Sequence, residues 1–180
     1  GESDDPQFQL DILKGMNEGL KGKRNVRMPS GWDKVATKLS QSPNPTIREL
    51  SQSLSLTFGS AAALNALRER LSDRSADQSA RTNALEALLA SKDPQLPQTL
   101  QKLLNEPSLR GAALRGLAAY DHPATPEAIL QVYPELGPLQ KKDALGTLVS
   151  RASFAKALLK ALADKKVPTR DLTAEFLRQL

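Results

Sequence analysis

Few residues of this chain could carry chemistry. It has no cysteine and one histidine, which excludes disulfides, thiolate zinc sites, iron–sulfur ligation and cysteine nucleophiles, and nearly excludes histidine-rich metal sites. The histidine, His122, follows Asp121 in a turn-like junction. Adjacent residues at a turn rarely give the carboxylate–imidazole geometry of a catalytic triad, and the sequence has no Gly-x-Ser-x-Gly motif. We therefore interpret His122 as a solvated turn residue rather than a general base.

Two further patterns could hold an ion or a phosphate. Asp171 and Glu175 are four residues apart, so on one helix their carboxylates would share a face. Two carboxylates alone make a poor divalent-ion site, and pairing with Arg170 and Arg178 is the simpler role. The glycines between residues 15 and 31 match neither phosphate-binding spacing. The sequence therefore predicts no catalytic residue, no cofactor and no metal site.

Basic residues are the remaining candidates. The formal net charge is +5, and most of the excess lies in residues 151–180. A smaller cluster comprises Lys21, Lys23, Arg24 and Arg27. Basic clusters can bind nucleic acid or anionic lipid, but a modest charge run can also be a solvated face. The candidate interaction face consists of five cations: Lys156, Lys160, Lys165, Lys166 and Arg170.

Helices must position these residues. The chain contains 31 Leu and 23 Ala against 5 Val and 3 Ile, and Leu and Ala favour helices whereas β-branched residues favour strands. Aromatic residues make up 4%, so small aliphatic side chains must fill the core, which disfavours a large cofactor pocket. No apolar run approaches the roughly 20 residues of a membrane span. The sequence predicts an all-α chain without membrane contact.

Three segments share an Ala-Leu pattern that recurs about every 30 residues: Asn83-Ala-Leu-Glu-Ala-Leu88, Ala112-Ala-Leu-Arg-Gly-Leu117 and Asp143-Ala-Leu-Gly-Thr-Leu148. Second helices with their own leucine stripes lie between them. A short helix pair cannot bury its apolar face alone, so successive pairs stack. We predict a right-handed α-solenoid of short HEAT-like or armadillo-like helix pairs.

Prolines and capping residues indicate where the helices start, because proline is tolerated in a first helical turn and Ser, Thr, Asp and Asn cap helices. Asn44, Thr125 and Thr169 are the expected caps. The expected helices are 7–19, 31–41, 45–57, 60–72, 77–90, 96–105, 108–120, 126–133, 138–149, 152–164 and 170–180. Residues 1–43 are predicted to form a capping part of the same domain, with Trp32 and Phe8 closing the core, and 44–180 the repeats.

The last third of the chain carries a more specific set of strings: Val132-Tyr-Pro-Glu-Leu136, Lys142-Asp-Ala-Leu145, Leu148-Val-Ser-Arg151, Ala155-Lys-Ala-Leu-Leu159, Val167-Pro168, Asp171-Leu172 and Arg178-Gln-Leu180. These resemble the HEAT-like region of large planctomycete-type membrane-bound dehydrogenase proteins with a heme-binding Cys-x-x-Cys-His domain. The resemblance is specific from about 132 to 180.

The resemblance implies a fragment of a periplasmic or otherwise extracytoplasmic oxidoreductase, in which this piece connects a β-propeller to the heme module. The chain contains no Cys-x-x-Cys-His motif, so that activity would lie elsewhere in the parent protein. The matched positions would serve as helix caps and contacts between repeats, with Ser150 capping the next helix and Arg151 binding the preceding repeat. They are Asp143, Ser150, Arg151, Pro168, Asp171, Arg178 and Gln179.

Taken together, the sequence predicts a non-catalytic scaffold or spacer that contacts protein, either adjoining domains of its own chain or another protein. The alternative is a nucleic-acid-binding HEAT-like domain, of the DNA glycosylase kind, with a basic concave face. That chemistry would need a carboxylate near aromatic side chains, and aromatic residues are scattered here.

Overall fold

The structure is a computed structural model that describes residues 5–23 and 26–178. Every regular element in these ranges is helical, which confirms the predicted all-α class. The chain divides into two compact units, Gly1–Asp93 and Pro94–Leu180.

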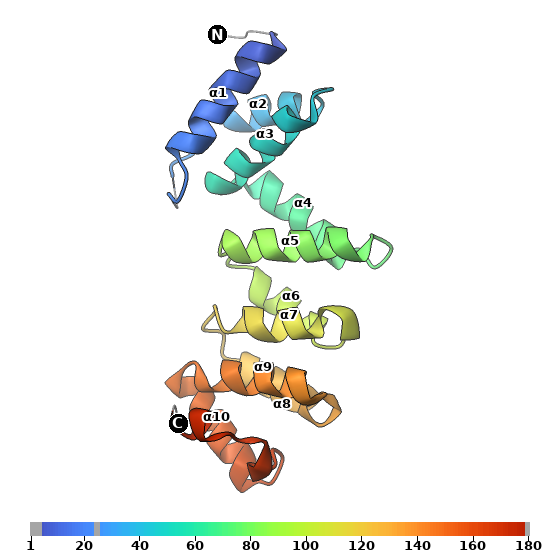
Figure 1. The fold of residues 1–180 in the computed structure, drawn as a ribbon, viewed down its shortest axis with the longest axis vertical. Coiled ribbons are helices and arrows are strands. Elements are labelled where there is room, and N and C mark those ends of the chain that lie inside the picture. Colours follow the sequence, from blue (N-terminus) through green and yellow to red (C-terminus); the bar gives the residue numbers. More distant parts are fainter. Residues whose placement is uncertain (1–4, 24–25, 179–180) are drawn as a thin grey trace. The chain divides into compact units, whose positions relative to one another are not determined.

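The described residues of the first unit form five helices, drawn from blue to green in Figure 1. Helices α1 and α2 both pack on α3, and α4 packs along α5. Their bounds are α1 (Pro6–Gly19), α2 (Trp32–Ser40), α3 (Pro45–Thr57), α4 (Ala61–Ser72) and α5 (Gln78–Ala90).

An apolar cluster joins α1, α2 and α3. Trp32 is 6% exposed and packs edge-on against Phe58, with the ring centroids 5.0 Å apart. Its indole Nε1 donates to Ser55 Oγ at 2.9 Å, so the polar edge of the ring is satisfied inside the core. Phe8 was expected to close the core with Trp32, but its side chain is 49% exposed. That expectation is wrong, because Leu13 rather than Phe8 is the buried residue of α1.

The second unit arranges its helices in two rows (Figure 1, yellow to red). Helix α7 packs beside α9, while α8 contacts both α6 and α10. The bounds are α6 (Leu96–Leu103), α7 (Pro107–Leu117), α8 (Thr125–Val132), α9 (Pro138–Val149), α10 (Ala152–Ala163) and α11 (Ala174–Leu177). Two 3-10 turns, η1 (Tyr133–Glu135) and η2 (Thr169–Asp171), follow α8 and precede α11.

The recurring Ala-Leu residues occupy equivalent places on α5, α7 and α9. Each is at most 2% exposed, so the same face of each helix is buried within its own unit. They are Ala84, Leu85, Leu88, Ala113, Leu114, Leu117, Ala144, Leu145 and Leu148.

The helices begin only in part where the prolines and capping residues predict. Proline stands in the first turn of α3, α6, α7, α8 and α9, and Asn44 Oδ1 accepts from the Thr46 amide at 3.0 Å. The caps expected at Thr125 and Thr169 are wrong, because Thr125 lies inside α8 and Thr169 begins η2. The continuous helix expected over 170–180 is also wrong, since Leu172 is extended and separates η2 from α11.

Candidate functional site

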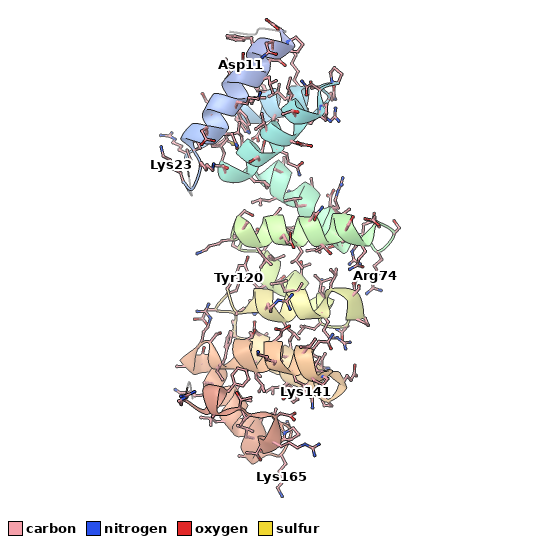
Figure 2. All side chains as sticks on the ribbon, viewed as in Figure 1. Asp11, Lys23, Arg74, Tyr120, Lys141 and Lys165 are labelled. Atoms are coloured by element: carbon pink, nitrogen blue, oxygen red, sulfur yellow. The ribbon has the colours of Figure 1, made fainter. Side chains whose placement is uncertain are left out.

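The five predicted cations lie on the last elements of the second unit. Lys156 and Lys160 are one turn apart on α10, Lys165 and Lys166 follow its end, and Arg170 lies in η2. All five side chains are exposed. None of the five forms an ion pair with any residue in the described ranges. Figure 2 labels Lys165 in the loop after α10. We refer to these five residues as the basic face.

The backbone at Lys165 is unusual for a lysine. Its φ is 57°, a left-handed conformation that glycine adopts more easily. The amide of Lys166 donates to Ala161 O at 2.8 Å, and that of Lys165 to Leu162 O at 3.0 Å. These bonds form a Schellman end to α10. The helix end therefore presents a lysine side chain where glycine would be the relaxed choice.

Side chains on α9 and just beyond it bind α7. Asp143 Oδ2 accepts from Arg115 Nη1 at 2.7 Å, and Thr147 Oγ1 donates to Leu114 O at 2.6 Å. Arg151 Nη2 donates to Ala118 O at 2.9 Å. Asp143, Thr147 and Arg151 are spaced four residues apart and contact α7 or the residue that ends it. The sequence analysis named Asp143 and Arg151 but not Thr147, although Thr147 lies four residues from each of them.

Asp171 connects η2 to α9 and η1. Its Oδ2 accepts from Lys141 Nζ at 2.9 Å and from the Tyr133 hydroxyl at 3.1 Å. The hydrogen bond from Lys141 lowers the pKa of Asp171, and the Tyr133 hydroxyl adds to that effect. Burial, followed by the nearby Asp171 charge, raises the pKa of Tyr133. Asp171 therefore stabilises the turn, and the prediction that it shares a helix with Glu175 is wrong.

A basic residue stands two positions before the repeated Ala-Leu segment in α5, α7 and α9. In α5 and α7 this residue binds a carbonyl at the end of the preceding helix. Arg81 Nε on α5 donates to Leu71 O in the last turn of α4 at 2.9 Å. Arg110 Nε on α7 donates to Leu104 O, just after α6, at 2.6 Å. Both guanidinium groups are buried, and positive charge at a helix C-terminus is favourable. Lys141 occupies the aligned position on α9. Sequence reasoning missed this role, although the spacing of the three cations follows the pattern.

The end of α5 is held by a partly buried ion pair. Asp93 is fully buried, and its two carboxylate oxygens accept from Arg68 Nε at 2.7 Å and Nη2 at 2.6 Å. The hydrogen bond to Asp93 raises the pKa of Arg68. This two-pronged contact ties the loop after α5 to α4.

The remaining matched positions have ordinary surroundings. Ser150 Oγ donates to Thr147 O at 2.7 Å, and α10 begins after Arg151 without a side-chain cap. The expectation that Ser150 caps α10 is therefore wrong, because its hydroxyl binds the helix before it. Pro168 is half-buried and Arg178 is exposed. Gln179, like Arg24 of the smaller basic cluster, lies outside the described residues.

His122 is half-buried rather than fully solvated. Its Nδ1 lies 3.0 Å from Gln101 Nε2 and accepts from the Ala124 amide at 3.3 Å. A backbone amide can only donate, so Nδ1 is an acceptor and is not the protonated nitrogen that a triad carboxylate would hold. The contacts give His122 a structural role in the turn between α7 and α8.

Within the described ranges, no group of three or more His, Asp or Glu side chains is placed to hold a metal ion. No helix there is both long enough and apolar enough to cross a bilayer.

The fold places the chain in the all-α class. Comparison of the chain with protein-family models, with curated proteins and with solved structures finds no match.

Proposed function

We propose that the chain is a non-catalytic helical-repeat scaffold, and that the basic face docks an acidic surface of a protein partner. The observation that carries this proposal is the gathering of five exposed cations on α10, the following loop and η2, none of which forms an ion pair with another described residue. Unpaired surface charges of one sign attract an oppositely charged surface and speed its encounter.

The arrangement of the second unit supports a scaffold role. Two rows of helices with contacts at repeat spacing are what a right-handed HEAT-like solenoid requires. Such proteins act through the surface they present rather than through a deep pocket.

We also propose, from the resemblance of residues 132–180, that the parent protein is a planctomycete-type membrane-bound dehydrogenase acting outside the cytoplasm. The partner of the basic face is then its Cys-x-x-Cys-His heme module. The matched residues Asp143, Arg151 and Asp171 make contacts between helices or turns, as structural positions of a repeat would.

The test begins with the reading frame that encodes the chain. A Cys-x-x-Cys-His module in that frame supports the family proposal, and a free-standing frame overturns it. Binding of that isolated module is then measured by calorimetry for the unchanged chain and for a variant with Lys156→Glu, Lys160→Glu and Arg170→Glu. We expect at least about tenfold weaker binding, or about 1.4 kcal/mol.

The matched control changes the charge equally elsewhere. Lys14→Glu, Lys102→Glu and Lys142→Glu alter three exposed lysines outside the basic face, and this variant should bind like the unchanged chain. Equal binding by all three proteins would show that the basic face is not the docking surface.

Nucleic-acid binding is the second candidate, because the same cations could contact phosphates. The aromatic side chains of this region do not favour it, since Tyr133 and Phe154 are each 1% exposed and Phe176 is 7% exposed. Bases would find no stacking surface on these rings. Retention of the chain on duplex DNA at low salt, with a steep decrease as salt rises, would favour this candidate over protein docking.

A further inference from the structure

An apolar groove lies between α1 and α2 in the first unit. Five large apolar side chains in the described ranges are notably exposed, and three of them line this groove. Phe8 is 49%, Ile12 45% and Val35 49% exposed. The groove has a volume of about 280 Å³, and the buried Trp32 also lines it. Exposed apolar side chains that gather in one place mark an interaction surface more strongly than scattered ones do.

The geometry of the groove favours a helical occupant. Phe8 and Ile12 are one turn apart on α1, and Val35 lies on α2, so the walls are ridges of two helices. The backbone groups within a helix are already paired, so an extended strand would gain no main-chain hydrogen bonds from these walls. A third helix can place its own ridge of apolar residues between the two.

The charges around the groove indicate the kind of helix. The charged residues that line it are Lys34 and Lys38, and no carboxylate is among the lining residues. An occupant with acidic side chains beside its apolar stripe would therefore be complementary, and one with basic side chains would be repelled. We propose that this groove binds an amphipathic, acidic helix of a partner protein. The inference is independent of the basic face, which belongs to the second unit.

The chain contains its own reporter for this binding. Trp32 is its single tryptophan and lines the groove, so an occupant would change its fluorescence directly. The probe is a synthetic helical peptide of about 18 residues without aromatic side chains, with leucines at helical spacing and flanking glutamates. The control peptide replaces each glutamate with lysine. We expect the acidic peptide to bind at least about tenfold more tightly than the basic one.

Variants then locate the binding site. Val35→Glu should weaken binding of the acidic peptide at least about tenfold, because it places a like charge on the apolar wall. Leu159→Glu is the matched control, since Leu159 is similarly exposed at 48% but lies on α10. The double change Lys34→Glu and Lys38→Glu should reverse the preference between the two peptides. Circular dichroism establishes that each variant is folded, and Val35→Ser replaces Val35→Glu if that variant is not.

Three results would overturn the proposal. One is equal binding, or no binding, of the two peptides. Another is unchanged binding by both Val35 variants. The third is self-association of the chain in sedimentation experiments that Val35→Glu abolishes, which would assign the groove to a second copy of this chain.

Discussion

Helices α1–α3 and the helices of the second unit are held together in different ways. Around α1–α3, apolar side chains such as Ile47 and Leu54 supply most of the buried contact. The polar contacts in the described part of this group are fewer, and they include the buried bond from Trp32 Nε1 to Ser55 Oγ and an exposed one from Arg48 Nη1 to Ser42 O after α2. In the second unit, buried leucines are accompanied by side chains that bind backbone carbonyls of neighbouring helices or their ends, as Thr147 and Arg110 do. Apolar contacts are not directional, whereas these bonds require one register.

This difference concerns how each region specifies its packing. A stack of similar helices could slide by one turn without losing much apolar contact, so polar bonds at fixed places select the register. The α1–α3 group does not repeat, and the shapes of Trp32 and Phe58 already specify its packing. Its exposed apolar side chains line one groove, as Val35 does, whereas Leu139 and Leu159 of the second unit are exposed on separate helices.

The largest expected effect removes cohesion from the apolar cluster. Leu54 is fully buried on α3, and Leu54→Ala should lower the free energy of unfolding by about 2–5 kcal/mol because it removes apolar contacts and leaves a cavity. Urea unfolding followed by Trp32 fluorescence measures this in the first unit. Glu49→Ala is the control, since Glu49 is exposed on the same helix and should change stability by no more than about 0.5 kcal/mol. A small effect at Leu54 would mean that the cluster is not what holds α1–α3 together.

A smaller effect is expected from a carbonyl-binding side chain of the second unit. Arg110→Met retains an apolar stem but removes the donor to Leu104 O, and should cost about 1.5–3 kcal/mol as the loss of a charged hydrogen bond. Circular dichroism in urea follows the helices of both units, and Trp32 fluorescence recorded in parallel identifies the contribution of the first unit. Glu135→Gln separates the roles of Arg110, because Glu135 lies 3.8 Å from its Nη2 and is 72% exposed, so that ion pair contributes less than about 1 kcal/mol. If Glu135→Gln costs as much as Arg110→Met, the carbonyl contact is not the stabilising one.

The helices could be predicted from the sequence because their signals are local. Leucine and alanine spacing and prolines such as Pro138 depend on neighbours within a few turns, and most predicted helices agree with the structure to within a few residues. The end of the chain was mispredicted, because Asp171 is held by Lys141 and Tyr133, which are 30 and 38 residues away. No pattern among neighbouring residues predicts such a contact.

The candidate site was predicted less completely than the fold. Exposed lysines such as Lys156 could be named from charge alone, since surface cations need no partner. The roles of Arg81 and Arg110 require knowing which carbonyl each guanidinium reaches. The groove at Val35 depends on two separate helices leaving a gap, and the amphipathic pattern of either helix alone does not reveal it.

The smallest expected effect is a pH dependence that belongs to the second unit. The Lys141 hydrogen bond holds the pKa of Asp171 below its ordinary value near 3.9, so folding favours the charged carboxylate. Its contribution is present above that ordinary value and is lost as pH falls through the lower, folded-state pKa. For a partly exposed pair we expect about 1 kcal/mol.

Asp171→Asn should therefore reduce stability at neutral pH and lessen the further loss on acidification, measured by circular dichroism in urea between pH 7 and about pH 2. Tyr133→Phe, which removes one donor to the carboxylate, should give a partial version of the same change. If Asp171→Asn leaves the acid dependence unaltered, then the contact with Lys141 does not stabilise the turn at η2.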